Sequence, residues 1–302
     1  MSERYKLQLE PFALPDYARR IQGGETGAAL YRCDSRVVKR TEGGAGLEEI
    51  ANNITGYRGI SDAGGSRILP EGIEWHIDDM NGWIVMPDLG SDMSVRDLAG
   101  DRVDTAYSVL MREILKMVTE SAKDSSDEQV AGLRVLTAQL KAWLKKINEM
   151  TPGLFSSDLP GMLDELDLEK SASRTSSVMI QDFTPDNIFV NGERAAFIDP
   201  WHQQTYRGTF IPSLAQYRAN AVEIREFPSA VSANDAMLAT LKQIACVLHL
   251  TDEQLSAQKL LGEALQYSLS AYVRLEREPG RAAKYVGIAE YKINNLHEML
   301  GK

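Results

Sequence analysis

Short apolar runs of the β type dominate the chain as far as Pro87. The stretch RRIQGGETGAALYRC predicts a strand, a glycine-containing turn and a second strand. After the turn at DSR, the β-branched pair in VVKR favours a third strand. IEWHI and WIVMP, separated by DDMNG, predict a hairpin. One helix interrupts these strands, because Leu47, Ile50, Ala51 and Ile54 recur with the spacing of a single helical face.

From Ser94 onward the apolar positions follow the period of a helix. Helices are predicted in AYSVLMREILKMVTESA, EQVAGLRVLTAQLKAWLKKINEM, SLAQYRANAVEI, NDAMLATLKQIACVLHL, DEQLSAQKLLGEALQYSLSAYVRLE and AKYVGIAEYKINNLHEML. PDLGSD, which is rich in turn residues, separates the β-rich part from the helical part. We therefore expect an α+β fold with two lobes, a small β-rich N-lobe over residues 1–87 and a large, mainly helical C-lobe over residues 88–302.

A short β segment lies among the predicted helices of the C-lobe. IFVNGERAAF predicts a hairpin, with Asn191-Gly192 as its turn signal. Carboxylates and an amide flank this hairpin at Asp182, Asn187 and Asp199. Taken alone, these polar residues are either turn formers and strand caps or the holders of a metal ion and a reacting hydroxyl.

Charge and composition exclude several classes of protein. The 302 residues carry a formal net charge of −10, which argues against a nucleic-acid partner because phosphates require a basic face. The two cysteines are too few for a disulfide framework, and the first residues lack the apolar core of a signal peptide. No apolar run reaches the length of a membrane span. We expect a cytoplasmic protein that does not associate with membranes; its oligomeric state stays open.

The order of these elements resembles the protein-kinase-like fold, and more closely the group of aminoglycoside phosphotransferases, choline kinases and fructosamine kinases. That group carries a loop of the type H-G-D-x-x-x-x-N, then a hairpin, then I-D-[WFP]. Here the loop is Ile180-Gln181-Asp182-Phe183-Thr184-Pro185-Asp186-Asn187, the hairpin is IFVNGERAAF, and the last motif is Ile198-Asp199-Pro200. The glycine turn GGETGAAL and the later VVKR also resemble the first lobe of the group.

The resemblance implies roles for the three polar residues around the hairpin. Asp182 would orient the acceptor hydroxyl and accept its proton. Asn187 and Asp199 would hold Mg²⁺, which takes few protein ligands and completes its shell with phosphate and water. Phosphoryl transfer depends mainly on positioning and on neutralised charge, which such a set supplies.

The resemblance also implies a nucleotide site in the N-lobe. Lys39 would bind the α and β phosphates of ATP, and its partner carboxylate comes from the following helix. Helical period does not separate Glu48 from Glu49, and we favour Glu49. The glycine turn would bring backbone amides to the phosphates, Met86 would line the adenine pocket, and the Leu89 amide would contact the base. The expected nucleotide-site residues are therefore Gly24, Gly27, Lys39, Glu49, Met86 and Leu89.

Three positions depart from the pattern of the group. Ile180 replaces the usual histidine and Gln181 the usual glycine of the loop. Ser213-Leu214-Ala215 stands where the group often has Asp-Leu-Ala, a run that braces the loop, so this brace is changed.

The expected function is that of an enzyme, a kinase that moves the γ-phosphate of ATP to a hydroxyl of a small molecule with Mg²⁺ as cofactor. The acceptor would be an amino sugar, an aminoglycoside-like compound or a related metabolite. The acidic cluster in SSDLPGMLDELDLEK would attract a polyamine or an amino sugar, although a solvated helix face or loop explains that cluster at least as well. Two alternatives stay open: a Ser/Thr kinase that acts on a peptide in a biosynthetic pathway, and a pseudokinase that binds without transfer.

Overall fold

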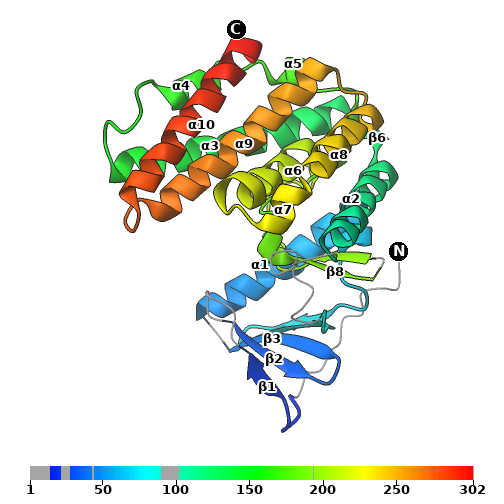
Figure 1. Cartoon of the computed structure of the whole chain (residues 1–302). Helices are drawn as coiled ribbons and strands as arrows, with labels where there is room; N and C mark the ends of the chain where they lie inside the picture. Colours follow the sequence, from blue (N-terminus) through cyan, green and yellow to red (C-terminus); the bar gives the residue numbers. More distant parts are fainter. Residues whose placement is uncertain (1–13, 22–27, 43, 90–101, 193, 302) are drawn as a thin grey trace.

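The computed structural model describes residues 14–21, 28–42, 44–89, 102–192 and 194–301. It has a small β-rich lobe and a large helical lobe, with helix α1 lying between them (Figure 1). This is the α+β, two-lobed architecture expected from the sequence. Strand β5 ends at Pro87 and the next described helix begins at Arg102, so the division of the chain after residue 87 stays a prediction.

The small lobe is a five-stranded antiparallel sheet in the order β1-β2-β3-β5-β4. Its elements are β1 Arg19–Ile21, β2 Ala29–Cys33, β3 Arg36–Glu42, α1 Gly44–Ile60, β4 Glu74–Ile77 and β5 Asn81–Pro87. Asp78 closes the β4–β5 hairpin by accepting hydrogen bonds from the amides of Met80 and Asn81. Residues on both faces of β5 are buried, because α1 packs against one face and a cluster with Val38 and Trp83 covers the other.

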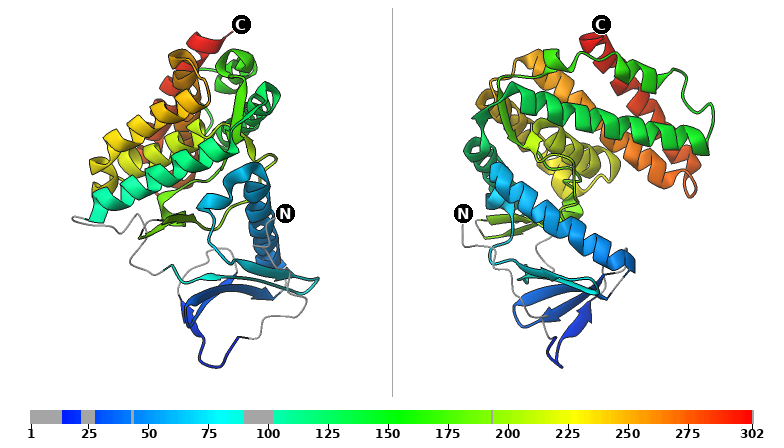
Figure 2. Two further views of the ribbon diagram at one scale, coloured as in Figure 1. Left: turned by 90° about the vertical axis from the view of Figure 1, so that its right-hand side faces the viewer. Right: turned by 180° about the vertical axis from the view of Figure 1, so that it is seen from behind.

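Helices make up most of the large lobe. They are α2 Arg102–Ser121, α3 Ser126–Met150, α4 Leu159–Asp164, α5 Leu168–Ser171, α6 Ile211–Arg218, α7 Pro228–Ser232, α8 Asn234–Val247, α9 Asp252–Arg274 and α10 Pro279–Leu300. Helices α9 and α10 form an antiparallel pair that packs on α3 and α6 (Figures 1 and 2). Among the described residues, no helix combines the length and the apolar character needed to cross a membrane.

Two small sheets lie within the helical lobe. The first has the order β10-β7-β6, with β6 Lys123–Asp124, β7 Thr175–Val178 and β10 Arg207–Gly208. The second is the expected hairpin, β8 Ile188–Asn191 and β9 Arg194–Phe197. Its register pairs Asn191 with Arg194, so Gly192, with φ of 57°, takes the first turn position that the sequence had indicated for Asn191.

Helix α1 packs closely on the segment that follows β9. A Cβ atom at Gly56 would lie 2.6 Å from the carbonyl oxygen of Pro200, and one at Gly59 would overlap the ring of Tyr206. Glycine is therefore the residue that fits at both positions. The right-hand view of Figure 2 shows α1 running from the helical lobe to the β sheet. This contact fixes α1, a helix packed on the small lobe's sheet, against the loops of the large lobe.

Candidate active site

Lys39 is a lysine buried on β3, with a side chain that is 3% exposed. Its Nζ lies 2.5 Å from Oε1 of Glu49 and 3.0 Å from Oδ1 of Asp199, and it donates to Oδ1 of Asn53 at 2.9 Å. A buried ammonium group needs such partners because it has lost its water. The three oxygens match the three N–H groups of lysine. One cation thus joins β3, α1 and the segment after β9.

The partner of Lys39 on α1 is Glu49. Glu49 is buried and faces β3, whereas Glu48 is exposed. Asn53 lies one turn further along the same face and donates from Nδ2 to the carbonyl oxygen of Pro200 at 3.0 Å. Asn53 is not among the site residues predicted from the sequence. Its position four residues after Glu49, next to the apolar face of the helix, was the available signal.

Asp199 adopts a left-handed backbone with φ of 51°, an uncommon conformation for a residue other than glycine. Its backbone amide donates to the hydroxyl of Tyr57 at 3.2 Å. Lys39 holds Oδ1 of the carboxylate, while no group within the described residues hydrogen-bonds to Oδ2. The side chain is 36% exposed. One oxygen is therefore fixed and the other is free to bind a cation.

Asn187 lies at the same end of the hairpin as Asp199. It ends the 3₁₀ turn η4 (Pro185–Asn187), and its carbonyl oxygen accepts from the amide of Ile198 at 2.9 Å. This bond extends the β8–β9 ladder by one pair and sets Asn187 across from the residue that precedes Asp199. The described part of the chain has no group of three or more His, Cys, Asp and Glu side chains placed for a metal. The hard oxygens of one amide and one carboxylate nevertheless fit Mg²⁺, which draws its remaining ligands from phosphate and water.

Asp182 also has a left-handed backbone, with φ of 55°. The next residue, Phe183, is buried against the rings of Phe197, Phe210 and Tyr217, which anchors the loop. Solvent reaches the Asp182 side chain, and no described group hydrogen-bonds to its carboxylate. The carboxylate is therefore available to a ligand.

The surroundings of Asp182 raise its pKa to about 6. The main cause is loss of hydration from the protein packed around the side chain, and the carboxylates of Asp186 and Asp199 add repulsion. Because solvent reaches the side chain, the loss of hydration is partial and the repulsion is partly screened, so both act on the pKa less than at an enclosed carboxylate. Asp186 itself pairs with Arg225 at the edge of the loop. The structure thus brings Asp182 within electrostatic range of Asp199.

The loop around Asp182 is held by residues of two later segments. Ile180, at the position of the group's histidine, is buried in the main core. The backbone amide of Ile180 donates to Oγ of Ser213 at 3.3 Å. Ser213, which stands in place of the group's aspartate, therefore still contacts the loop. A second contact comes from Gln203, which is not among the site residues predicted from the sequence. No motif marks Gln203, since its partners come together only in the folded chain.

Met86 and Leu89, the two residues expected to contact adenine, lie in different surroundings. Met86 is buried in the main core and pairs with Val37 across the sheet. Leu89 is half-buried and lines a cavity of about 450 Å³ together with Pro87, Phe189 and Ala196. Gly24 and Gly27 lie outside the described residues. The structure therefore places Leu89, but not Met86, at a cavity between the end of β5 and the hairpin.

The acidic cluster between α3 and β7 is already paired. Asp158 caps α4 by accepting from the amide of Gly161. The other members each contact a basic side chain, in the pairs Asp164–Lys141, Glu165–His297, Asp167–Lys170 and Glu169–Arg134. Such exposed pairs contribute little and leave a weak field for a cationic acceptor. The arrangement favours the interpretation of a solvated helix surface.

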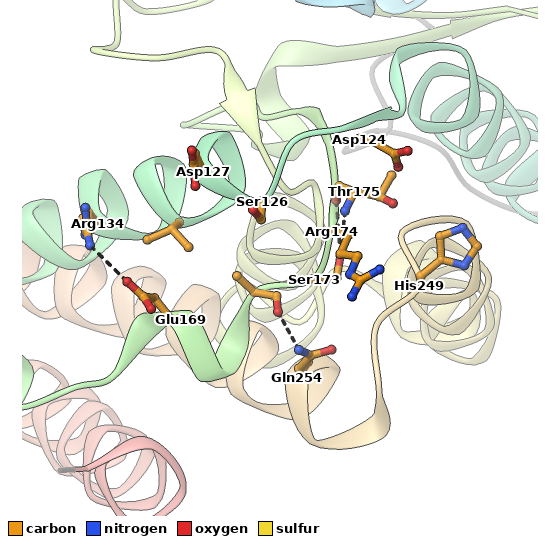
Figure 3. A pocket seen from close by; sticks show the side chains of 12 residues that line it. Asp124, Ser126, Asp127, Arg134, Glu169, Ser173, Arg174, Thr175, His249 and Gln254 are labelled. Atoms are coloured by element: carbon orange, nitrogen blue, oxygen red, sulfur yellow. Dashed lines mark hydrogen bonds and ion pairs between the residues drawn. The ribbon is translucent and has the colours of Figure 1, made fainter.

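A larger cavity, of about 870 Å³, lies elsewhere in the helical lobe (Figure 3). It is bordered by α3, by the approach to β7 and by the start of α9, and Arg134, Glu169 and His249 stand around it. None of the residues predicted for phosphoryl transfer lines it. The larger cavity and the candidate site therefore lie in different parts of the structure.

Comparison with known proteins finds solved structures of similar fold but no match in sequence. No protein-family model matches the chain, and no curated protein matches it in sequence. A candidate fructosamine-3-kinase of Haemophilus somnus 129PT superposes with a TM-score of 0.60 at 11% identity, over 93% of this chain and 91% of that one. A choline/ethanolamine kinase family protein of Mesorhizobium loti gives a TM-score of 0.51 at 13% identity, over 93% and 88%.

A third solved structure is a thermostable mutant of aminoglycoside phosphotransferase APH(4)-Ia in a complex with ADP and hygromycin B. It superposes with a TM-score of 0.54 at 11% identity, over 92% of this chain and 94% of that one. The chain therefore has a two-lobed, protein-kinase-like fold. Within that class, its structural neighbours are the fructosamine kinases, choline kinases and aminoglycoside phosphotransferases expected from the sequence.

The raised pKa of Asp182 predicts how stability depends on pH. In the folded protein the Asp182 carboxyl group keeps its proton up to about pH 6, whereas in the unfolded chain it loses the proton near the ordinary aspartate pKa. The free energy of unfolding therefore falls as the pH rises between these two pKa values. Asp182→Asn removes the unfavourable free energy of ionising this carboxyl group in the folded protein, so it should raise the Tm at about pH 8 but not at about pH 4. Asp79→Asn, in the exposed β4–β5 turn, is the control and should leave the Tm unchanged at both pH values. A gain at about pH 4 equal to that at about pH 8 would contradict the assigned ionisation.

Proposed function

We propose that the protein is an ATP-dependent phosphotransferase that moves the γ-phosphate to a hydroxyl group of a small molecule. The observation that carries the proposal is the junction at Lys39. A lysine of the β sheet, a glutamate of the helix behind it and an aspartate after the hairpin meet there. The loop that bears Asp182 leads into the same hairpin.

Lys39 would contact the α and β phosphates. Its ammonium group is held in place by Glu49 and Asn53 before any ligand binds, so little reorganisation is needed when negative charge arrives. Asn187 and Asp199 would hold Mg²⁺, which when bound neutralises charge on the phosphate oxygens. The free Oδ2 of Asp199 supports this assignment.

Asp182 would orient the acceptor hydroxyl and accept its proton. In the transfer, the acceptor oxygen forms a bond to the γ-phosphorus, the bond from that phosphorus to the bridging oxygen breaks, and ADP leaves with the electron pair. The hydroxyl proton passes to the Asp182 carboxylate. With a pKa of about 6, this group is mostly ionised at neutral pH and able to take the proton.

The chemistry of the structural neighbours supports a small acceptor. The neighbour bound to ADP also holds hygromycin B, a small molecule, and the other two are of the fructosamine-3-kinase and choline/ethanolamine kinase types. A cytoplasmic location accords with this proposal, because ATP is available there and both described cysteines are free thiols.

The role of Asp182 is testable by turnover and binding together. Asp182→Asn should lower turnover about a hundredfold or more, with water or an added alcohol as acceptor, because proton transfer is lost. The dissociation constant for Mg·ATP should stay within about twofold, since Asp182 does not contact the nucleotide in this account. Turnover follows from ADP formation and affinity from calorimetry, with Asp79→Asn as the control. Undiminished turnover in Asp182→Asn would remove the residue from the mechanism.

Two variants separate the contribution of Lys39 to folding stability from its contribution to nucleotide binding. Lys39→Met leaves the Glu49 carboxylate buried without its cation and should cost about 3–5 kcal/mol of stability. Lys39→Met with Glu49→Leu removes both charges and should recover most of the Tm. Both variants should bind Mg·ATP about tenfold or more weakly, since each loses the positive charge that would face the phosphates. Full nucleotide affinity in the stable double variant would exclude Lys39 as a phosphate ligand.

A further inference from the structure

Two neutral side chains bond to consecutive backbone amides at the start of the proposed catalytic loop. The amide of Ile180 donates to Oγ of Ser213 at 3.3 Å, and the amide of Gln181 donates to Oε1 of Gln203 at 2.9 Å. Both acceptors are buried, Ser213 at 2% and Gln203 at 6% exposure. Because Asp182 is the next residue, these two bonds fix the backbone from which its carboxylate projects.

Gln203 makes a second bond to the same strand. Its Nε2 donates to the carbonyl oxygen of Met179 at 2.8 Å. In an extended chain, the carbonyl of one residue and the amide two residues later point to the same side, where a neighbouring strand would pair with them. The side-chain amide of Gln203 thus pairs with Met179 and Gln181 as a strand residue would.

This pairing continues a ladder that the backbone begins. Strand β10 pairs with β7 through Arg207 and Gly208, and the carbonyl oxygen of Tyr206 then accepts from the amide of Met179 at 2.9 Å. Beyond that point the backbone diverges and Gln203 supplies the next two bonds. The ladder therefore reaches the residue directly before Asp182.

The same segment is held from the other side by α1. The backbone amide of Gln203 donates to the hydroxyl of Tyr206 at 3.3 Å, and the Tyr206 ring lies against Gly59. Gln203 also follows Asp199 by a few residues. It therefore connects the loop of Asp182 to the segment of Asp199 and to the helix that carries Glu49.

A second buried glutamine forms the same pattern at the opposite end of β7. Gln129, on α3, accepts from the amide of Ser173 and donates from Nε2 to the carbonyl oxygen of Thr175 at 2.7 Å. It is fully buried. Gln129 also donates to Oγ of Ser173 at 3.3 Å, so it makes three side-chain bonds where Gln203 makes two. Of the two glutamines, only Gln203 holds the end that leads to Asp182.

We propose that Gln203 is a positioning residue for phosphoryl transfer, which sets the Asp182 loop against the Asp199 segment, with Ser213 as its partner on the adjacent amide. A neutral pair here fixes the loop without placing a further negative charge beside Asp182. The inference rests on the proposed function, and its test includes a measurement that does not depend on activity.

The test compares Gln203→Met with Gln129→Met. Gln203→Met removes two side-chain hydrogen bonds and Gln129→Met removes three, and both retain an apolar side chain of similar length. The loss of Tm in Gln129→Met should therefore be at least as large as in Gln203→Met. Gln203→Met should lower the kcat of ATP hydrolysis, with water as acceptor, by roughly tenfold to a hundredfold, because small displacements of a reacting group are costly. Its KM for Mg·ATP should stay within about twofold. Gln129→Met should keep kcat within about twofold of the wild type.

Amide hydrogen exchange gives the readout that is independent of activity. Exchange at residues 179–182 should rise in Gln203→Met, while exchange at residues 173–175 should rise only in Gln129→Met. Gln203→Asn, which is polar but one methylene shorter, should reproduce the loss of kcat and serves if the methionine variant does not fold.

The outcomes separate this inference from the proposed function. Equal kcat values for the two methionine variants, or unchanged exchange at residues 179–182 in Gln203→Met, would overturn the role of Gln203. A wild-type protein that neither binds nor hydrolyses Mg·ATP would overturn the proposed function, and with it the role of Gln203 in transfer. The exchange data would in that case still report whether Gln203 holds the loop.

Discussion

The rest of the site depends on one buried cation. The Lys39 ammonium group has lost its water, and in a medium of low polarity it requires oxygens on every N–H. Those oxygens come from Glu49 and Asn53 on α1 and from Asp199 after the hairpin. Because the two lobes supply different partners, their positions are coupled. A shift of α1 would separate Lys39 from Glu49 and Asn53, and a shift of the hairpin would remove Asp199 from it.

Close packing and backbone conformation reinforce this coupling. Gly56 and Gly59 let α1 approach the segment after Asp199 more closely than any side chain would allow. Asp182 and Asp199 both have left-handed backbones, a conformation that costs free energy in residues other than glycine and persists only where the surroundings hold it. Here the buried aromatic cluster around Phe183 holds one aspartate, and Lys39 with Tyr57 holds the other. Strain at these two positions accords with a site arranged for a ligand.

The sequence predicted the elements with strong periodicity and the motif residues that follow them. It did not predict β7, because three of the four residues of TSSV are polar and show no apolar alternation, and their burial depends on tertiary contacts such as the hydrogen bond from Gln129 to Thr175. Asn53 and Gln203 were missed for a related reason: their amides act through tertiary contacts with Pro200, Met179 and Gln181. The choice between Glu48 and Glu49 depends on the rotation of α1 about its axis, which packing sets and helical period does not.

The central claim is that Lys39, Asn187 and Asp199 form a site for Mg·ATP. The most direct measurement is the change in Tm on adding ATP, with and without Mg²⁺, for the wild type and for Asp199→Asn. At about 100 times the dissociation constant, a ligand that binds only the folded state adds about 2.7 kcal/mol of stability. The account predicts a Mg²⁺-dependent rise in Tm for the wild type that is lost in Asp199→Asn. A rise of equal size in both proteins, or no rise with any nucleotide, would contradict it.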